Sequence, residues 1–211
     1  MTATNTRPIL YSFRRCPYAI RARLALSVAE TPVALREIKL AAKPQAFLDV
    51  SPSATVPALV TANGVLDESL EIMDWALGQN DPEGWLAMPE EGWDWIVRND
   101  GPFKQALDRT KYGTRYPDSD PQEQREIAST FLLDLNAQID SWMFGKPTLL
   151  DFAILPFVRQ FAFIDKGWFD AQPWPDLQAW LEAFLASDRF LDVMAKYPVW
   201  QEGDPPTHFP T

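Results

Sequence analysis

The stretch PILYSFRRCPYAIRARLALSVA, residues 8–29, passes from one hydrophobic period to another and so organises the first part of the chain. Residues 8–13 form a short apolar and aromatic run after a proline, which predicts a β-strand. From residue 17 to about residue 29 the apolar side chains recur every four positions, the spacing of a helix buried on one side. Pro17 suits the first position of that helix, because its missing N–H would have no helical partner there.

Strand and helix patterns continue as far as residue 80. VALREIKL (33–40) predicts a second strand, two short apolar runs around Asn63-Gly64 predict a hairpin, and ESLEIMDWALG (68–78) has helical spacing. Two strands separated by a helix favour a right-handed parallel pair, to which the hairpin adds antiparallel strands. Residues 1–80 are therefore predicted to form a thioredoxin-like α/β domain. The segment 81–92, rich in proline, glycine and acidic residues, is the predicted linker.

Residues 93–211 carry helical patterns and are predicted to form an all-helical domain. One helix is expected over 93–112, kinked or broken near Gly101-Pro102. TLLDFAILPFVRQFAFI (148–164) is nearly all apolar and is expected to be the central helix. Thr148 and Asp151 have the spacing of a capping box at its start.

Composition excludes several classes of function. Among 211 residues there are 19 basic and 29 acidic ones, a net charge of −10, which disfavours general binding to nucleic acid. No apolar run is long enough to cross a bilayer, and the N-terminus lacks the pattern of a signal peptide. With one cysteine and one histidine, His208, a structural metal site is not expected. A single cysteine cannot form an intramolecular disulfide, which agrees with a protein of the reducing cytoplasm.

Cys16 is the only cysteine and lies at the junction of the predicted strand and helix. The free N–H groups of a first helical turn and the helix dipole favour a negatively charged sulfur there. Four neighbouring arginines add positive charge: Arg14, Arg15, Arg21 and Arg23. Such surroundings activate a thiol as a nucleophile, although a lone cysteine is more often a small, inert core residue.

The motif CPYA (16–19) has no second cysteine. A mixed disulfide formed on Cys16 therefore needs an external thiol to resolve it, and glutathione is the abundant cytosolic candidate.

These motifs resemble glutathione transferases of the omega class. That class opens its first helix with a Cys-Pro-Phe/Tyr-Ala turn followed by Arg-x-Arg-Leu, and this chain has Arg21, Arg23 and Leu24 there. The resemblance continues in order along almost the whole chain, through Lys43-Pro44, Val56-Pro57, Glu68-Ser69 and the capping box at Thr148.

The resemblance implies roles for these residues. Cys16 would be the catalytic nucleophile of a thiol transferase or reductase, with glutathione as co-substrate and no metal. Glutathione would bind to the backbone at a cis Val56-Pro57 bond and to polar side chains nearby, which are Lys43, Glu68 and Ser69. The acceptor, a small hydrophobic or disulfide-containing molecule, would contact Phe13, Tyr18 and Trp200. The family also implies a homodimer.

Two other functions remain open from the sequence. Tyr11 or Ser12 could activate the thiol of bound glutathione for conjugation, as in most other glutathione transferases. Alternatively, the chain could be a non-catalytic interaction protein with this fold, as stringent starvation protein A is.

Overall fold

The computed structural model describes residues 7–210 and separates into two compact units. The sheet unit comprises Met1–Gly84 and Asp188–Thr211, and the helical unit comprises Trp85–Ser187. The predicted combination of a thioredoxin-like α/β part and an all-helical part is confirmed. The change of unit at residue 84 falls inside the predicted linker, 81–92. Residues 188–211, which the sequence analysis placed in the helical domain, belong instead to the sheet unit.

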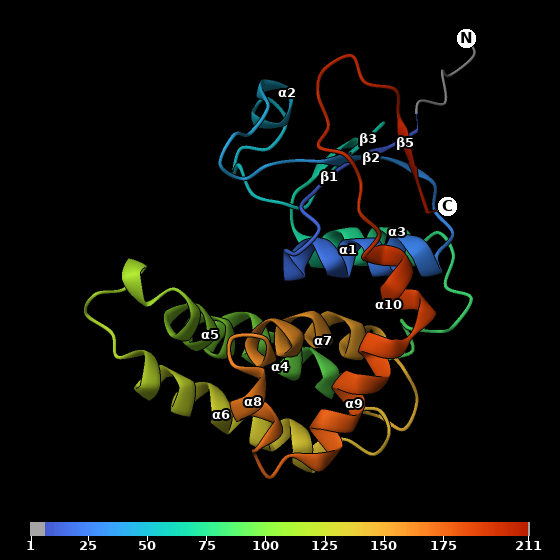
Figure 1. The fold of residues 1–211 in the computed structure, drawn as a ribbon. Helices are drawn as coiled ribbons and strands as arrows, with labels where there is room; N and C mark the ends of the chain where they lie inside the picture. The colour runs from blue at the N-terminus through green and yellow to red at the C-terminus, as the bar shows by residue number, and fades with distance from the viewer. Residues whose placement is uncertain (1–6, 211) are drawn as a thin grey trace. The chain divides into compact units, whose positions relative to one another are not determined.

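The sheet unit is built from five strands and four helices along the described part of the chain (Figure 1). In chain order these are β1 (Ile9–Ser12), α1 (Pro17–Val28), β2 (Val33–Glu37), α2 (Gln45–Leu48), β3 (Ala58–Thr61), β4 (Gly64–Leu66), α3 (Ser69–Leu77), α10 (Asp188–Val193) and β5 (Thr207–Phe209). The strand order is β4-β3-β1-β2-β5. Helices α1 and α3 pack together on one face of the sheet, and α10 packs against α1.

Strand pairing follows the predicted pattern. β1 and β2 are parallel, with Ile9 opposite Ala34, and β3 runs antiparallel to β1. The predicted hairpin joins β3 to β4, where Thr61 pairs with Gly64. Gly64 has φ +136°, a conformation that favours glycine. The carboxyl end of β1 therefore leads directly into the Cys16 junction and α1.

Strand β5 was not predicted, because its three residues lie in a proline-rich tail with no strand pattern of their own. Val33 pairs with Phe209, and Ala34 pairs with His208, so the strand extends the sheet antiparallel to β2. A pairing between residues so far apart in the sequence depends on tertiary contacts that local propensity does not contain. Its effect is to fix the C-terminal segment beside β2.

The helical unit contains, in chain order, α4 (Glu91–Arg98), a π-helical turn (Asn99–Phe103), α5 (Lys104–Lys111), a 3₁₀ turn (Gly113–Arg115), α6 (Pro121–Gln138), α7 (Leu149–Ala162), α8 (Lys166–Asp170) and α9 (Pro175–Ala186). The predicted interruption near Gly101-Pro102 is this π-helical turn, in which Pro102 lies. None of the helices described between residues 7 and 210 is both long and apolar enough to cross a membrane.

The predicted capping box at the start of α7 is confirmed. The Asp151 carboxylate accepts hydrogen bonds from the Thr148 N–H at 2.8 Å and the Thr148 hydroxyl at 3.0 Å. It also accepts one from the Met143 N–H at 3.0 Å. Burial raises the pKa of Asp151, while these hydrogen bonds oppose the rise. The carboxylate thus ties the loop before α7 to its first turn.

Candidate active site

Cys16 caps the N-terminus of α1. Its backbone is extended (φ −71°, ψ 123°), its N–H donates to the Phe13 carbonyl at 3.0 Å, and its carbonyl accepts from the Ile20 N–H at 2.9 Å. The residue is half-buried and forms no disulfide. Its Sγ lies 3.6 Å from the Val56 carbonyl oxygen, to which the neutral thiol donates. The sequence prediction of a cysteine at a strand-to-helix junction is therefore confirmed.

Val56 and Pro57 are joined by a cis peptide bond, as the sequence analysis expected. Both residues are buried. Among residues 7–210, the Val56 N–H donates to no protein acceptor, and its carbonyl meets only the Cys16 thiol. The backbone of Val56 thus presents one donor and one weakly used acceptor next to the sulfur.

An apolar cluster lies beside Cys16. Its buried members are Tyr11, Ile38, Phe47, Val56 and Ala58. Cys16, Phe13 and Trp200 pack against this cluster as partly buried residues, so the structure brings together two of the three predicted acceptor-contacting residues. Trp200 is held there because its backbone N–H donates to the backbone carbonyl of Glu37 at 2.8 Å. The third, Tyr18, lies on α1 with the Arg21 guanidinium 5.5 Å from its ring centroid.

The three predicted polar contacts for glutathione lie at element ends. Lys43 is exposed just before α2, and Glu68 is exposed at the N-cap position of α3. Ser69 is the first residue of α3, but it is buried, and its hydroxyl accepts from the Arg21 guanidinium at 3.4 Å. The structure gives no direct contact among these three side chains.

The four arginines around Cys16 differ sharply in exposure. Arg15 is exposed, whereas Arg21 and Arg23 are buried. The Arg23 guanidinium donates to the Val193 carbonyl at 2.9 Å, to the Arg14 carbonyl at 2.7 Å and to the Ser12 hydroxyl. Burial lowers the pKa of Arg23 to about 10, against the opposing charges of Glu37 and Cys16. Arg23 therefore connects the turn before Cys16 with the C-terminal segment.

Glu37 is a residue of this site that the sequence analysis missed. Its carboxylate accepts from the Arg14 N–H at 2.7 Å, while its carbonyl accepts from Trp200. Burial raises the pKa of Glu37, and the Arg14 hydrogen bond and the Arg23 charge oppose the rise. A single acidic residue at the end of a strand belongs to no recognisable motif. Only the structure shows that Glu37 contacts Arg14 and Trp200 beside the site.

Replacing Glu37 by glutamine should change how stability depends on pH. A raised carboxyl pKa contributes stability that is complete below the ordinary value of 4.5 and is lost as pH rises through the raised value. Because glutamine resembles the protonated form, the stability of Glu37→Gln relative to wild type should increase from about pH 4 to pH 8, by ~1.4 kcal/mol per unit of pKa elevation. Urea unfolding across this range measures it, with exposed Glu202→Gln as control. A constant difference between variant and wild type would contradict the assignment.

The two hydroxyls of the conjugation alternative are engaged elsewhere. Tyr11 is buried, its hydroxyl donates to the Ala46 carbonyl at 3.2 Å, and it accepts from the Arg36 guanidinium at 2.5 Å. Ser12 is fully buried and its hydroxyl accepts from Arg23. Cys16, which is half-buried, is thus more exposed than Tyr11 or Ser12.

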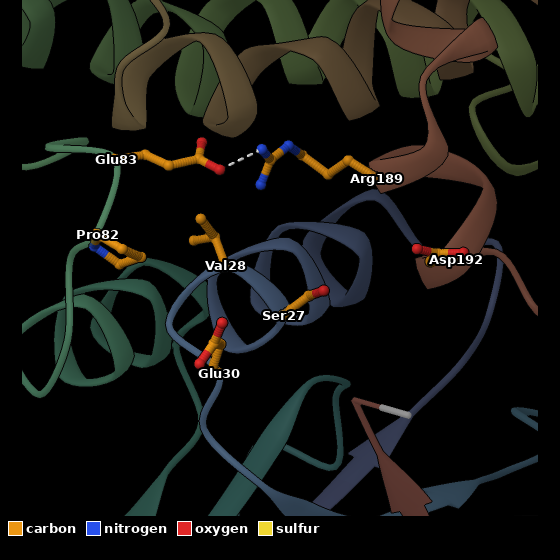
Figure 2. Close-up of a pocket in the computed structure, with 7 residues that line it drawn as sticks. All are labelled: Ser27, Val28, Glu30, Pro82, Glu83, Arg189 and Asp192. Carbon is orange, nitrogen blue, oxygen red and sulfur yellow. Dashed lines mark hydrogen bonds and ion pairs between the residues drawn. The ribbon is translucent and has the colours of Figure 1, made fainter.

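A separate open hollow lies near the other end of α1 (Figure 2). It is lined by Ser27, Val28, Glu30, Pro82, Glu83, Arg189 and Asp192. The Arg189 guanidinium and the Glu83 carboxylate form an ion pair of 2.6 Å there. None of the predicted site residues lines this hollow, so it is distinct from the surroundings of Cys16.

Comparison with known proteins agrees with this architecture. Residues 10–84 match the family described as "Glutathione S-transferase, N-terminal domain", and residues 104–183 match "Glutathione S-transferase, C-terminal domain". A comparison with curated proteins found no match.

Among solved structures, similar ones include glutathione transferase Omega 3C from Trametes versicolor, with TM-score 0.75 and 20% identity over 90% of this chain and 84% of that one. A glutathione transferase family member from Pseudomonas fluorescens pf-5, with two glutathione bound, has TM-score 0.75 and 21% identity over 92% and 94%. A glutathione transferase from Pseudomonas putida, with one glutathione disulfide bound per subunit, has TM-score 0.76 and 19% identity over 92% and 93%. Together with the two matched domains, the fold shows that this chain belongs to the glutathione S-transferase family.

Proposed function

We propose that the protein is an omega-like, glutathione-dependent thiol transferase that uses Cys16 as its only nucleophilic thiol. The observation that carries the proposal is the placement of a half-buried sulfur, outside any disulfide, at the N-terminus of α1, 3.6 Å from the Val56 carbonyl. The amides of the first helical turn and the charge of Arg23 favour the ionised sulfur.

The reaction on a glutathionylated substrate proceeds in two exchanges. The Cys16 thiolate attacks the glutathione sulfur, an S–S bond forms to Cys16, and the substrate leaves as a thiolate. A glutathione thiolate then attacks the mixed disulfide, which releases glutathione disulfide and regenerates the Cys16 thiolate. A disulfide substrate without glutathione first undergoes one such round, in which one half leaves as a thiolate and the other half leaves joined to glutathione, and this glutathionylated half then reacts as above. Two glutathione molecules are oxidised for each disulfide substrate reduced, or one for each glutathionylated substrate.

The Val56 backbone would bind glutathione as an added strand. Its N–H, which has no acceptor among the described residues, can donate to the cysteinyl carbonyl of glutathione, and its carbonyl can accept the cysteinyl N–H. That second bond replaces the hydrogen bond from the Cys16 thiol. Glutathione binding would therefore remove an interaction that favours the neutral thiol, and so promote ionisation of the sulfur.

The charged ends of glutathione have partners at the element ends. The first turn of α3, beginning at Ser69, offers free N–H groups to the γ-glutamyl carboxylate, and Glu68 can pair with the ammonium group. Lys43 is exposed and available for the glycyl carboxylate. The related proteins from Pseudomonas fluorescens pf-5 and Pseudomonas putida hold glutathione and glutathione disulfide, respectively, which supports the same ligand here.

We also propose an acceptor site, a homodimeric assembly and a cytoplasmic location for the protein. Phe13 and Trp200 would contact a small hydrophobic or disulfide-containing acceptor, with Tyr18 beside them. As in other members of the family, the protein would act in the cytoplasm as a homodimer. The helical unit exposes apolar side chains one turn apart on α4, Trp93 (46% exposed) and Val97 (68% exposed), which suit contact with a second copy.

An assay with two reactions tests the proposed chemistry. We expect the purified protein to reduce hydroxyethyl disulfide with glutathione, followed through coupled glutathione reductase, faster than it conjugates glutathione to chlorodinitrobenzene. Dominant conjugation would favour Tyr11 or Ser12 as the activating group. Absence of both activities and of glutathione binding would favour the interaction protein.

A further inference from the structure

Arg36 is a half-buried residue of β2 whose guanidinium lies over aromatic rings. Its Cζ is 4.0 Å from the Trp200 ring centroid and 5.3 Å from that of Tyr11. Its Nη1 donates to the Tyr11 hydroxyl at 2.5 Å, and that hydroxyl donates in turn to the Ala46 carbonyl. The cation is therefore fixed in position by stacking and by one hydrogen bond.

No carboxylate in the described part of the chain neutralises this cation. The chain carries 29 acidic residues against 19 basic ones, yet none within residues 7–210 forms an ion pair with Arg36. Apart from the bond to Tyr11, the guanidinium donates to no protein acceptor among those residues. A stacked guanidinium keeps its edge N–H groups available, and two of them match the two oxygens of a carboxylate.

The rings that hold Arg36 belong to the surroundings of the nucleophile. Tyr11 is a member of the apolar cluster, and Trp200 and Cys16 both pack against it. Trp200 lies edge-on to Tyr11, with 6.1 Å between ring centroids. Trp200 therefore contacts two things. It packs against the apolar cluster that also contacts Cys16, and its ring lies against the Arg36 guanidinium.

We propose that Arg36 binds a carboxylate of the acceptor, so that the preferred acceptors are anionic, carboxylate-bearing disulfides rather than neutral ones. This inference rests on the proposed thiol-transferase function. Glutathione also carries two carboxylates, but we have already assigned these to Lys43 and to the first turn of α3. Binding through charge should weaken as salt screens it.

Paired substrates test the inference. We expect the ratio of kcat/KM for dithiodipropionate, a dicarboxylate, to that for neutral hydroxyethyl disulfide to fall about tenfold in Arg36→Gln. The control Lys39→Gln removes an equal charge from an exposed residue and should change the ratio less than about twofold. The ratio should also fall with added salt in the wild type and stay nearly constant in Arg36→Gln.

Two results would overturn the assignment. If both disulfides lose activity equally in Arg36→Gln, the residue only supports Trp200. If the ratio stays constant while the KM for glutathione rises, the carboxylate bound is that of glutathione and not that of the acceptor.

A binding measurement separates this inference from the proposed function. Calorimetric titration of the unreactive Cys16→Ala protein with each disulfide does not depend on turnover. Stronger binding of dithiodipropionate, lost on adding Arg36→Gln, supports the anion site even if the wild type proves inactive. Equal binding of the two disulfides overturns it.

Discussion

Replacement of Cys16 by alanine should lower glutathione-dependent disulfide reduction by on the order of a thousandfold or more, because no other thiol in the chain can form the mixed disulfide. Serine at this position should be as inactive, since an uncharged hydroxyl does not attack sulfur at neutral pH. Glutathione binding should persist in both variants, because the proposed contacts at Val56 and α3 do not involve the sulfur. Steady-state rates with hydroxyethyl disulfide and calorimetric titration with glutathione measure the two effects.

The matched control is Ser27→Ala, near the other end of α1, which should keep its turnover. Turnover in Cys16→Ala close to that of the wild type would contradict the assigned nucleophile. It would return the chemistry to Tyr11 or Ser12, whose hydroxyls are buried and already hydrogen-bonded.

Replacement of Arg23 by methionine should lower the free energy of unfolding by about 3–5 kcal/mol, because three hydrogen-bond acceptors inside the fold would lose a charged donor, at about 1–3 kcal/mol each. Methionine fills much of the volume but leaves the carbonyls of Val193 and Arg14 without their donors. Glu37 also loses the nearby positive charge that opposes the rise of its pKa. Urea unfolding, followed by circular dichroism, measures the loss.

Arg15→Met provides the control, since it removes the same charge from an exposed neighbour. Its effect should stay within about 0.5 kcal/mol. If Arg23→Met does not fold, Arg23→Lys keeps the charge without the planar fork and should show an intermediate loss. Equal stabilities for the Arg15 and Arg23 variants would show that the buried hydrogen bonds of Arg23 contribute little.

The sequence contained most of the fold because local pattern and tertiary structure agree at many of its turns and helix starts. Pro17 at the first position of α1, Asn63-Gly64 at the hairpin and the Thr148–Asp151 capping box each act through neighbours within a few residues. Strand β5 could not be predicted in this way, because Phe209 becomes part of a strand only by pairing with Val33. The same long-range packing brings Trp200 to the sheet unit.

The site residues likewise differ in whether the sequence could predict them. Cys16 was found from its place between a predicted strand and a predicted helix, whereas the cis Val56-Pro57 bond was expected only from the resemblance to the omega class. Glu37 and Arg36 carry no such signal, since their importance depends on Trp200 and Arg14 meeting them across the sheet unit. Arg23 was expected to add charge near the sulfur, but only the structure shows that its hydrogen bonds hold backbone carbonyls as well.

The most direct measurement of the central claim is the intact mass of the protein after incubation with glutathione disulfide. We predict a gain of about 305 Da, one glutathionyl group, removed by dithiothreitol and absent in Cys16→Ala. Peptide mapping should place the group on Cys16. An unchanged mass in excess glutathione disulfide, with the thiol still open to alkylation, would contradict the account.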